Sequence, residues 1–155
     1  MKGMTIIVKT ISRWIKMLIF LFGLYIILFG DISPGGGFAG GVILASAYVL
    51  LMLAFGGDFV KQNLSPSLAL KLVCVGTLAF ATIAVAGLFY GPDAFFWNFI
   101  TQKWLAGEGS NLHFINAGII TLAECAIGLI VAAAIFLVII TFSTFKFDVS
   151  ANQKE

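Results

Sequence analysis

Glu124 is the residue best placed to do chemistry, because it is a carboxylic acid inside the otherwise apolar stretch 115–142. An unbroken helix over this stretch would place it on the order of 15 Å from the N-terminal end. Hydrocarbon disfavours a charged carboxylate, so an acid at that depth is costly and is commonly functional. We predict that Glu124 belongs to an ion or proton pathway. The alternative is a structural carboxylate that hydrogen-bonds a partner helix.

Three further polar residues are secondary candidates for the same pathway. At 100° per residue, His113 and Glu124 fall within roughly 60° of each other on a helix, and Thr121 lies slightly further round. We expect this face to meet protein or water. His113 could equally be a solvated or capping histidine at the membrane boundary, and Asp31 a plain loop aspartate.

The sequence contains few residues or motifs that could support enzymatic catalysis. The chain has one histidine, no HExxH or GxSxG motif and no cluster of residues at metal-ligand spacing. Cys74 and Cys125 both lie in apolar runs without a CxxC pattern, which is typical of cysteines that pack as small hydrophobes. We therefore predict a protein that is not an enzyme and that binds no cofactor, metal or nucleic acid.

The elements that must position these residues follow from composition. Apolar residues make up 61% of the chain and charged residues 10%, against about 45–50% and about 25% in soluble domains. Four apolar stretches, 11–29, 38–55, 68–89 and 115–142, approach the roughly 20 residues that cross a bilayer. We predict an all-α, multi-pass protein of the cell membrane, with one transmembrane domain over residues 1–155 that forms a four-helix bundle.

The basic residues predict the orientation of this bundle. Of nine Lys and Arg residues, only Lys103 lies in the loop between the third and fourth stretches. By the positive-inside rule, both termini and the 56–67 loop should be cytoplasmic. The opposite loop, 91–111, is rich in aromatic residues. It could form a helix in the membrane interface or a docking surface for a neighbouring subunit.

A glycine-rich turn joins the first two stretches, with the sequence GDISPGGGFAGG over residues 30–41. Pro34 cannot continue a helix, and successive glycines allow backbone angles closed to other residues. Gly37, Gly41 and Ala45 then recur every four residues, a spacing that lets another helix approach closely. The pattern indicates either a tight turn between packed helices or irregular backbone at membrane depth that protein must cover.

This turn carries a family resemblance. Pro34, Gly35, Gly36, Gly37 and Phe38, followed by Gly40 and Gly41 on a four-span chain, resemble the B subunit (MrpB/MnhB) of multisubunit cation/proton antiporters. Similar subunits occur in the antiporter-like modules of archaeal membrane-bound hydrogenases and related sulfur-reducing complexes. Asp31 stands where that pattern commonly has histidine, and Ala39 where it often has glutamine, which suggests a divergent branch of the hydrogenase type.

The resemblance implies an accessory membrane subunit of a Na⁺/H⁺ antiporter module, within a larger complex of membrane subunits. In such a complex the chain would help form the ion translocation route through Glu124. The competing hypothesis is a purely structural subunit, which seals helix interfaces and contacts no ion. A subunit of either kind should be unstable without its neighbours, because its small-residue helix faces would lack partners.

Overall fold

The structure is a computed structural model, and it describes residues 4–32, 34–56, 65–90, 95–100 and 118–152, the last nine of these by their backbone alone. It contains the long helices α1 (Ile6–Leu28), α2 (Gly36–Phe55), α4 (Pro66–Tyr90) and α7 (Ile119–Asn152). All four are long and apolar enough to cross a membrane, α7 over Ile119–Ser143. The prediction of an all-α protein with four transmembrane helices is confirmed, and the chain is a multi-pass membrane protein.

The bounds of the first three helices differ from the apolar stretches by a few residues. Helix α1 begins at Ile6, before the predicted residue 11, because Lys and Arg interrupt an apolar run without opposing a helix. Helix α4 begins with Pro66, a residue suited to the first helical position because it lacks an N–H. The hydroxyl of Ser65 accepts the Leu68 N–H at 3.2 Å and caps this helix.

Helix α7 begins later than predicted. Gly118 has a φ of +58°, a left-handed conformation that does not continue into a helix, so the first helical residue is Ile119. Asn98 accepts the Ile119 N–H through its side-chain oxygen at 3.3 Å. Residues 115–117, which the prediction included, lie outside the described residues. Glu124 is therefore about 7–8 Å along the helix, about half the expected depth.

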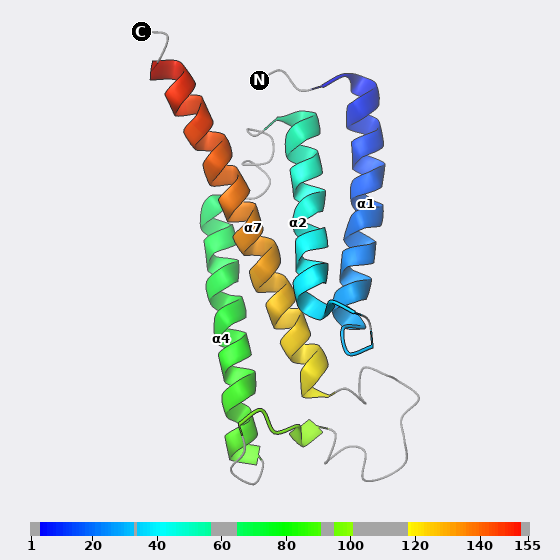
Figure 1. Cartoon of the computed structure of the whole chain (residues 1–155), viewed down its shortest axis with the longest axis vertical. Coiled ribbons are helices and arrows are strands. Elements are labelled where there is room, and N and C mark those ends of the chain that lie inside the picture. The colour runs from blue at the N-terminus through cyan, green and yellow to red at the C-terminus, as the bar shows by residue number, and fades with distance from the viewer. Residues whose placement is uncertain (1–3, 33, 57–64, 91–94, 101–117, 153–155) are drawn as a thin grey trace.

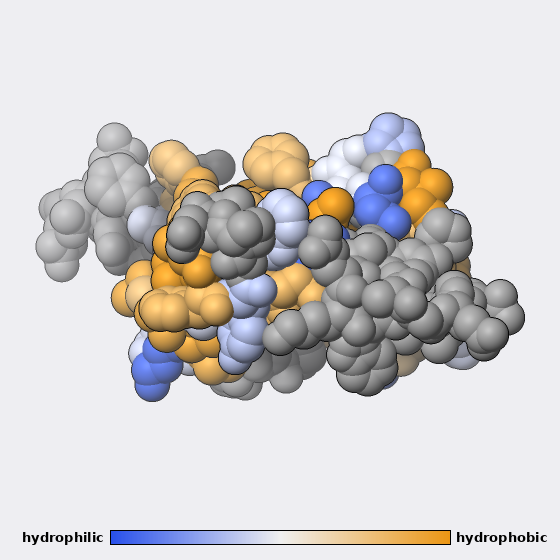
Figure 2. Space-filling model, turned by 90° about the horizontal axis from the view of Figure 1, so that it is seen from below, coloured by the Kyte–Doolittle hydropathy of each residue, from blue (hydrophilic) through white to orange (hydrophobic). Residues whose placement is uncertain are grey.

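The helices stand side by side in the order α1, α2, α7, α4 (Figure 1). Helix α2 packs between α1 and α7, and α4 packs chiefly on α7. This row is more open than a closed four-helix bundle, and large apolar side chains stay exposed on all four helices. Figure 2 views the molecule from below, roughly along the helices, and shows hydrophobic residues among the coloured surface atoms. Such a surface suits lipid or other membrane helices.

Small residues bring the helices into close contact. The carbonyl oxygen of Gly128 lies 2.7 Å from where a Cβ on Gly41 would sit, and Ala45 is 1% exposed. On the other side of α2, Gly40 faces Ile27 of α1. The predicted close approach along Gly37, Gly41 and Ala45 is confirmed, and the approaching helix is α7.

The inner core lies where α2, α4 and α7 meet, toward the end of the molecule at which the backbone of α7 continues. Phe136 and Ile140 of α7 are buried there with Ala69 of α4. The ring of Tyr48 meets the Phe136 ring edge-on, with 5.7 Å between centroids, an arrangement that aromatic pairs favour. This contact fixes the positions of α2 and α7 far from the glycine-rich turn.

The aromatic loop is described only at residues 95–100, and this part folds back on α4. The Phe96 N–H donates to the Ala84 carbonyl at 3.3 Å, and the Phe80 and Phe96 rings lie 5.4 Å apart. Residues 91–94 and 101–111 lie outside the described residues, so the interfacial helix and the docking surface remain alternative predictions. The N-terminal end of α1 and the C-terminal end of α7 lie at the same end of the molecule, at the top of Figure 1. Which end faces the cytoplasm stays a prediction.

Candidate functional site

The glycine-rich turn connects α1 to α2 in a few residues. After α1 ends, the N–H of Gly30 donates to the Ile27 carbonyl at 3.3 Å and that of Ile32 to the Phe29 carbonyl at 3.1 Å. Gly35 and Gly36 then have φ values of +115° and +50°. These left-handed angles turn the chain sharply into α2, and side-chain-bearing residues rarely adopt them. The described part of the segment is thus a tight turn between packed helices.

Glu124 of α7 points its carboxyl group into this turn. The Gly37 N–H donates a hydrogen bond to Glu124 Oε2. A Cβ on Gly36 would lie 2.5 Å from Oε2 and 2.8 Å from Oε1, and one on Gly30 would lie 3.1 Å from Glu124 Cγ. Gly30, Gly36 and Gly37 therefore form a cradle that holds the Glu124 side chain and has no room for side chains of its own. We call these three residues the glycine cradle.

The cradle places a carboxylate at the start of a helix. The first N–H groups of any α-helix lack intrahelical acceptors, and the helix dipole is positive there. Helix α2 begins with Gly35 as its cap, which offers no side-chain acceptor, and its first turn contains no acidic residue. Glu124, 87 residues away in the sequence, supplies the missing acceptor from a neighbouring helix. A hydrogen bond to a charged group contributes about 1.5–3 kcal/mol.

Thr121 shares the α7 face that carries Glu124. It is 8% exposed, and its Oγ1 has no hydrogen-bond partner among the residues that the structure describes. An α-helical threonine commonly donates to the carbonyl one turn back, as Thr141 does to Leu137 at 2.8 Å. Thr121 thus keeps a buried hydroxyl oxygen about one turn before Glu124 on α7.

Asp31, another predicted pathway residue, is not joined to Glu124 in the described part of the chain. Asp31 lies exposed on the turn, and the structure places no hydrogen bond or ion pair between its carboxylate and a described residue. His113 lies outside the described residues. Of the turn motif, Gly36, Gly37, Gly40 and Gly41 are buried between helices, whereas Pro34, Gly35 and Phe38 are exposed. The structure therefore brings together Glu124 and the glycines Gly36 and Gly37 of the motif.

Two residues have structural roles that were not predicted from the sequence. Gly30 was noted only as part of the turn, although it forms one wall of the cradle. Asn98 was not identified as the residue that caps α7. Asparagine is a preferred cap, but here 21 residues separate it from the helix start, so no local pattern reveals it.

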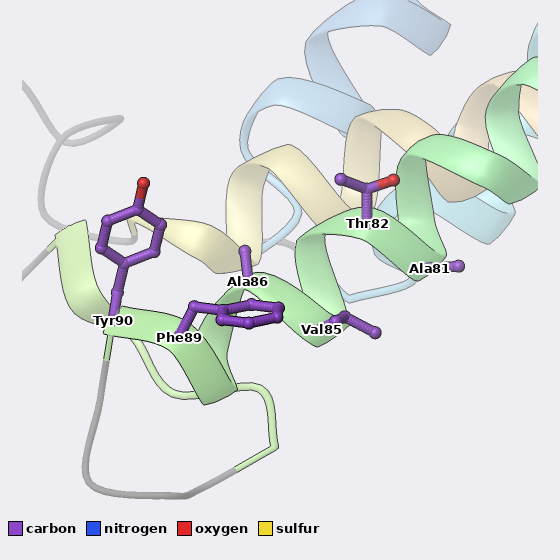
Figure 3. A pocket seen from close by; sticks show the side chains of 6 residues that line it. All are labelled: Ala81, Thr82, Val85, Ala86, Phe89 and Tyr90. Atoms are coloured by element: carbon purple, nitrogen blue, oxygen red, sulfur yellow. The ribbon is translucent and has the colours of Figure 1, made fainter.

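A separate hollow of about 580 Å³ runs along α4 (Figure 3). Its lining residues all come from that helix: Ala81, Thr82, Val85, Ala86, Phe89 and Tyr90. The Thr82 hydroxyl already donates to the Leu78 carbonyl at 2.8 Å. With no ionisable carboxylate, histidine or cysteine in its described lining, this hollow does not compete with Glu124 as an ion site.

Comparison with known proteins gives a consistent family. Residues 7–144 match the family described as a domain related to the MnhB subunit of Na⁺/H⁺ antiporters. Proteins named as candidate mnhB2 antiporter subunits are 29% identical over 143 residues in Staphylococcus saprophyticus and 30% identical over 148 residues in Staphylococcus haemolyticus. In both cases the alignment covers 92% of this chain and 97% of the relative. The chain belongs to the MnhB family of Na⁺/H⁺ antiporter subunits.

Proposed function

We propose that this chain is an accessory, non-catalytic membrane subunit of a multisubunit Na⁺/H⁺ antiporter, and that Glu124 helps form its ion translocation route. The observation that carries the proposal is the Glu124 carboxyl group held in the glycine cradle within a membrane span. Ionisable groups inside spans are costly and cluster on ion and proton pathways. Membership of the MnhB family supports the same role.

The chemistry available at this site is proton exchange on one carboxyl group. In its ionised form Glu124 accepts the Gly37 N–H, and the positive end of the α2 dipole stabilises the charge. A proton on Oε2 would convert that acceptor into a donor and break the contact, whereas a proton on Oε1 would leave the contact in place. The unpaired Thr121 hydroxyl provides a second oxygen on the same helix face.

The same hydrogen bond also favours the second candidate function, a purely structural subunit. If Glu124 serves only as the cap of α2, an uncharged side chain of the same shape with an acceptor oxygen should replace it. Glutamine meets that description, whereas alanine does not. The two functions therefore differ in what glutamine can do at this position.

The test compares Glu124→Gln, Glu124→Ala and the control Cys125→Ala in the assembled complex. Na⁺-dependent proton movement is measured in membrane vesicles, together with the amount of assembled complex. We expect Glu124→Gln to assemble normally and to lose antiport, and Cys125→Ala, at the neighbouring half-buried position, to keep both. Normal antiport in Glu124→Gln, with loss of assembly in Glu124→Ala, would establish the structural role and refute the ion route.

Partners are part of the proposal. The open row of helices exposes apolar surface on all four helices, and the reported relatives are named for an antiporter. We therefore place the chain beside other membrane subunits of an antiporter complex. Association with a hydrogenase remains a prediction. Affinity purification of the tagged chain from native membranes, followed by mass spectrometry of its neighbours, distinguishes an antiporter complex from a hydrogenase.

A further inference from the structure

The half of α1 that lies away from the glycine-rich turn carries a row of cations, which reaches from Lys9 to Lys16 near the middle of the helix. Lys9, Arg13 and Lys16 recur at helical spacing and lie within about 60° of one another on α1. Lys9 Nζ and Arg13 Cζ each lie 5.7 Å from the centroid of the Phe55 ring at the end of α2. The row therefore faces α2.

Lys16 differs from the other two cations in its contacts. Like Lys9 it is half-buried, but the structure gives its ammonium group no hydrogen bond, ion pair or ring contact with a described residue. The acidic side chains that the structure describes, Asp31 and Glu124, both lie by the turn at the far end of α1. A half-buried ammonium without a counter-ion is unfavourable in apolar surroundings.

An apolar groove continues from Lys16 along the seam between α1 and α2. Its volume is about 510 Å³, and Lys16 forms part of its lining with Met17, Phe20, Leu21 and Leu24 of α1 and Ala47 and Tyr48 of α2. From Lys16 to Leu24 the groove follows α1 for about 12 Å. A cation at one end of an apolar groove between two membrane helices matches a ligand with an anionic head group and a hydrocarbon tail.

We propose that this groove binds one anionic phospholipid, with an acyl chain along Phe20 and Leu24 and its phosphate near Lys16 and Arg13. Lysine and arginine side chains in a membrane extend toward the interface, where lipid phosphates lie. Basic pockets between transmembrane helices are known to attract anionic head groups. The lipid supplies the counter-ion that Lys16 lacks within the described chain. This site is independent of Glu124 and of the proposed ion route.

The test uses the chain within its assembled complex, reconstituted in phosphatidylcholine vesicles that contain a minor fraction of phosphatidylglycerol with a photoactivatable group on its acyl chain. After illumination, mass spectrometry maps the labelled peptides. We expect labelling at residues 17–24, and weaker labelling from a phosphatidylcholine probe of the same design. Lys16→Gln or Arg13→Gln should each reduce labelling by the anionic probe about fivefold, corresponding to about 1 kcal/mol per cation.

Two further variants separate charge from shape. Lys71→Gln removes an exposed cation from α4 and should leave labelling of the groove unchanged. Leu21→Trp keeps every charge, fills the groove and should reduce labelling. Equal labelling by both probes in the native chain, or equal effects of Lys16→Gln and Lys71→Gln, would overturn the proposal. So would efficient disulfide cross-linking between Leu21→Cys and another subunit of the assembled complex, because a protein helix would then occupy the groove.

Discussion

Replacement of Gly37 by alanine tests the glycine cradle directly, because two effects of opposite sign meet there. Alanine favours a helix over glycine by about 0.5–1 kcal/mol, so helix propensity alone predicts stabilisation. The structure predicts the reverse. A Cβ on Gly37 would collide with the backbone carbonyl oxygen of Glu124 and would lie 2.7 Å from Oε2. A backbone carbonyl inside α7 cannot move aside unless the helix moves.

The magnitude follows from these contributions. Overpacking at a tight contact costs about 1–3 kcal/mol, and loss of a helix cap costs about 0.5–2 kcal/mol. The gain in helix propensity offsets part of this. We therefore expect Gly37→Ala to destabilise the protein by roughly 1–4 kcal/mol. For a domain of this size, the middle of that range corresponds to roughly 5–10 °C in melting temperature.

The melting temperature of the chain is measured within the purified complex, and its readout is the fraction of the chain that stays soluble after heating in detergent. The matched control is Phe38→Ala, at the adjacent position, whose side chain is 63% exposed and should matter by about 0.5 kcal/mol or less. A melting temperature for Gly37→Ala equal to or above that of the native chain would refute the cradle, since propensity would then outweigh contact with Glu124.

Three other results are expected. Asn98→Ala should destabilise the start of α7 by about 0.5–2 kcal/mol and speed hydrogen exchange at the Ile119 amide. Asn98→Asp should keep this amide protected from exchange. Unchanged exchange in the alanine variant would count against this cap. Ile27→Ala should destabilise by about 2 kcal/mol or more, because Ile27 is 4% exposed and fills the contact with Gly128; an equal effect from Ile7→Ala, 72% exposed, would contradict that packing. Tags at both termini should resist protease in intact cells and be cut in opened ones; cleavage of either tag in intact cells would reverse the predicted orientation.

The spans could be predicted from sequence because hydropathy and length are local properties. The predicted bounds are wrong where the apolar stretch and the helix begin or end at different residues. Residues 6–10, which include Lys9, were left out of the predicted first stretch but lie inside α1. At the other end of the chain, the left-handed Gly118 delays the start of α7. Beyond residue 142 the backbone stays helical to Asn152, where hydropathy no longer signals a helix.

The candidate site was predictable only in part. The cost of an acid in hydrocarbon singled out Glu124, and the backbone freedom of glycine singled out the turn. Their meeting depends on how α7 crosses α2, and a single sequence gives no register between two helices so far apart. The open order of the row was hidden for the same reason: hydropathy predicted the third and fourth helices but not that α7 would be the chief neighbour of α4.

The cap that Glu124 gives to α2 has a consequence for synthesis. The ribosome completes the start of α2 long before it reaches residue 124, so the young hairpin of α1 and α2 enters the membrane with its turn lacking that acceptor. Only the last helix to be inserted closes the bond between Gly37 and Glu124. Contacts of such sequence separation form late. A product truncated before α7 therefore lacks the side-chain acceptor of the Gly37 N–H at the start of α2.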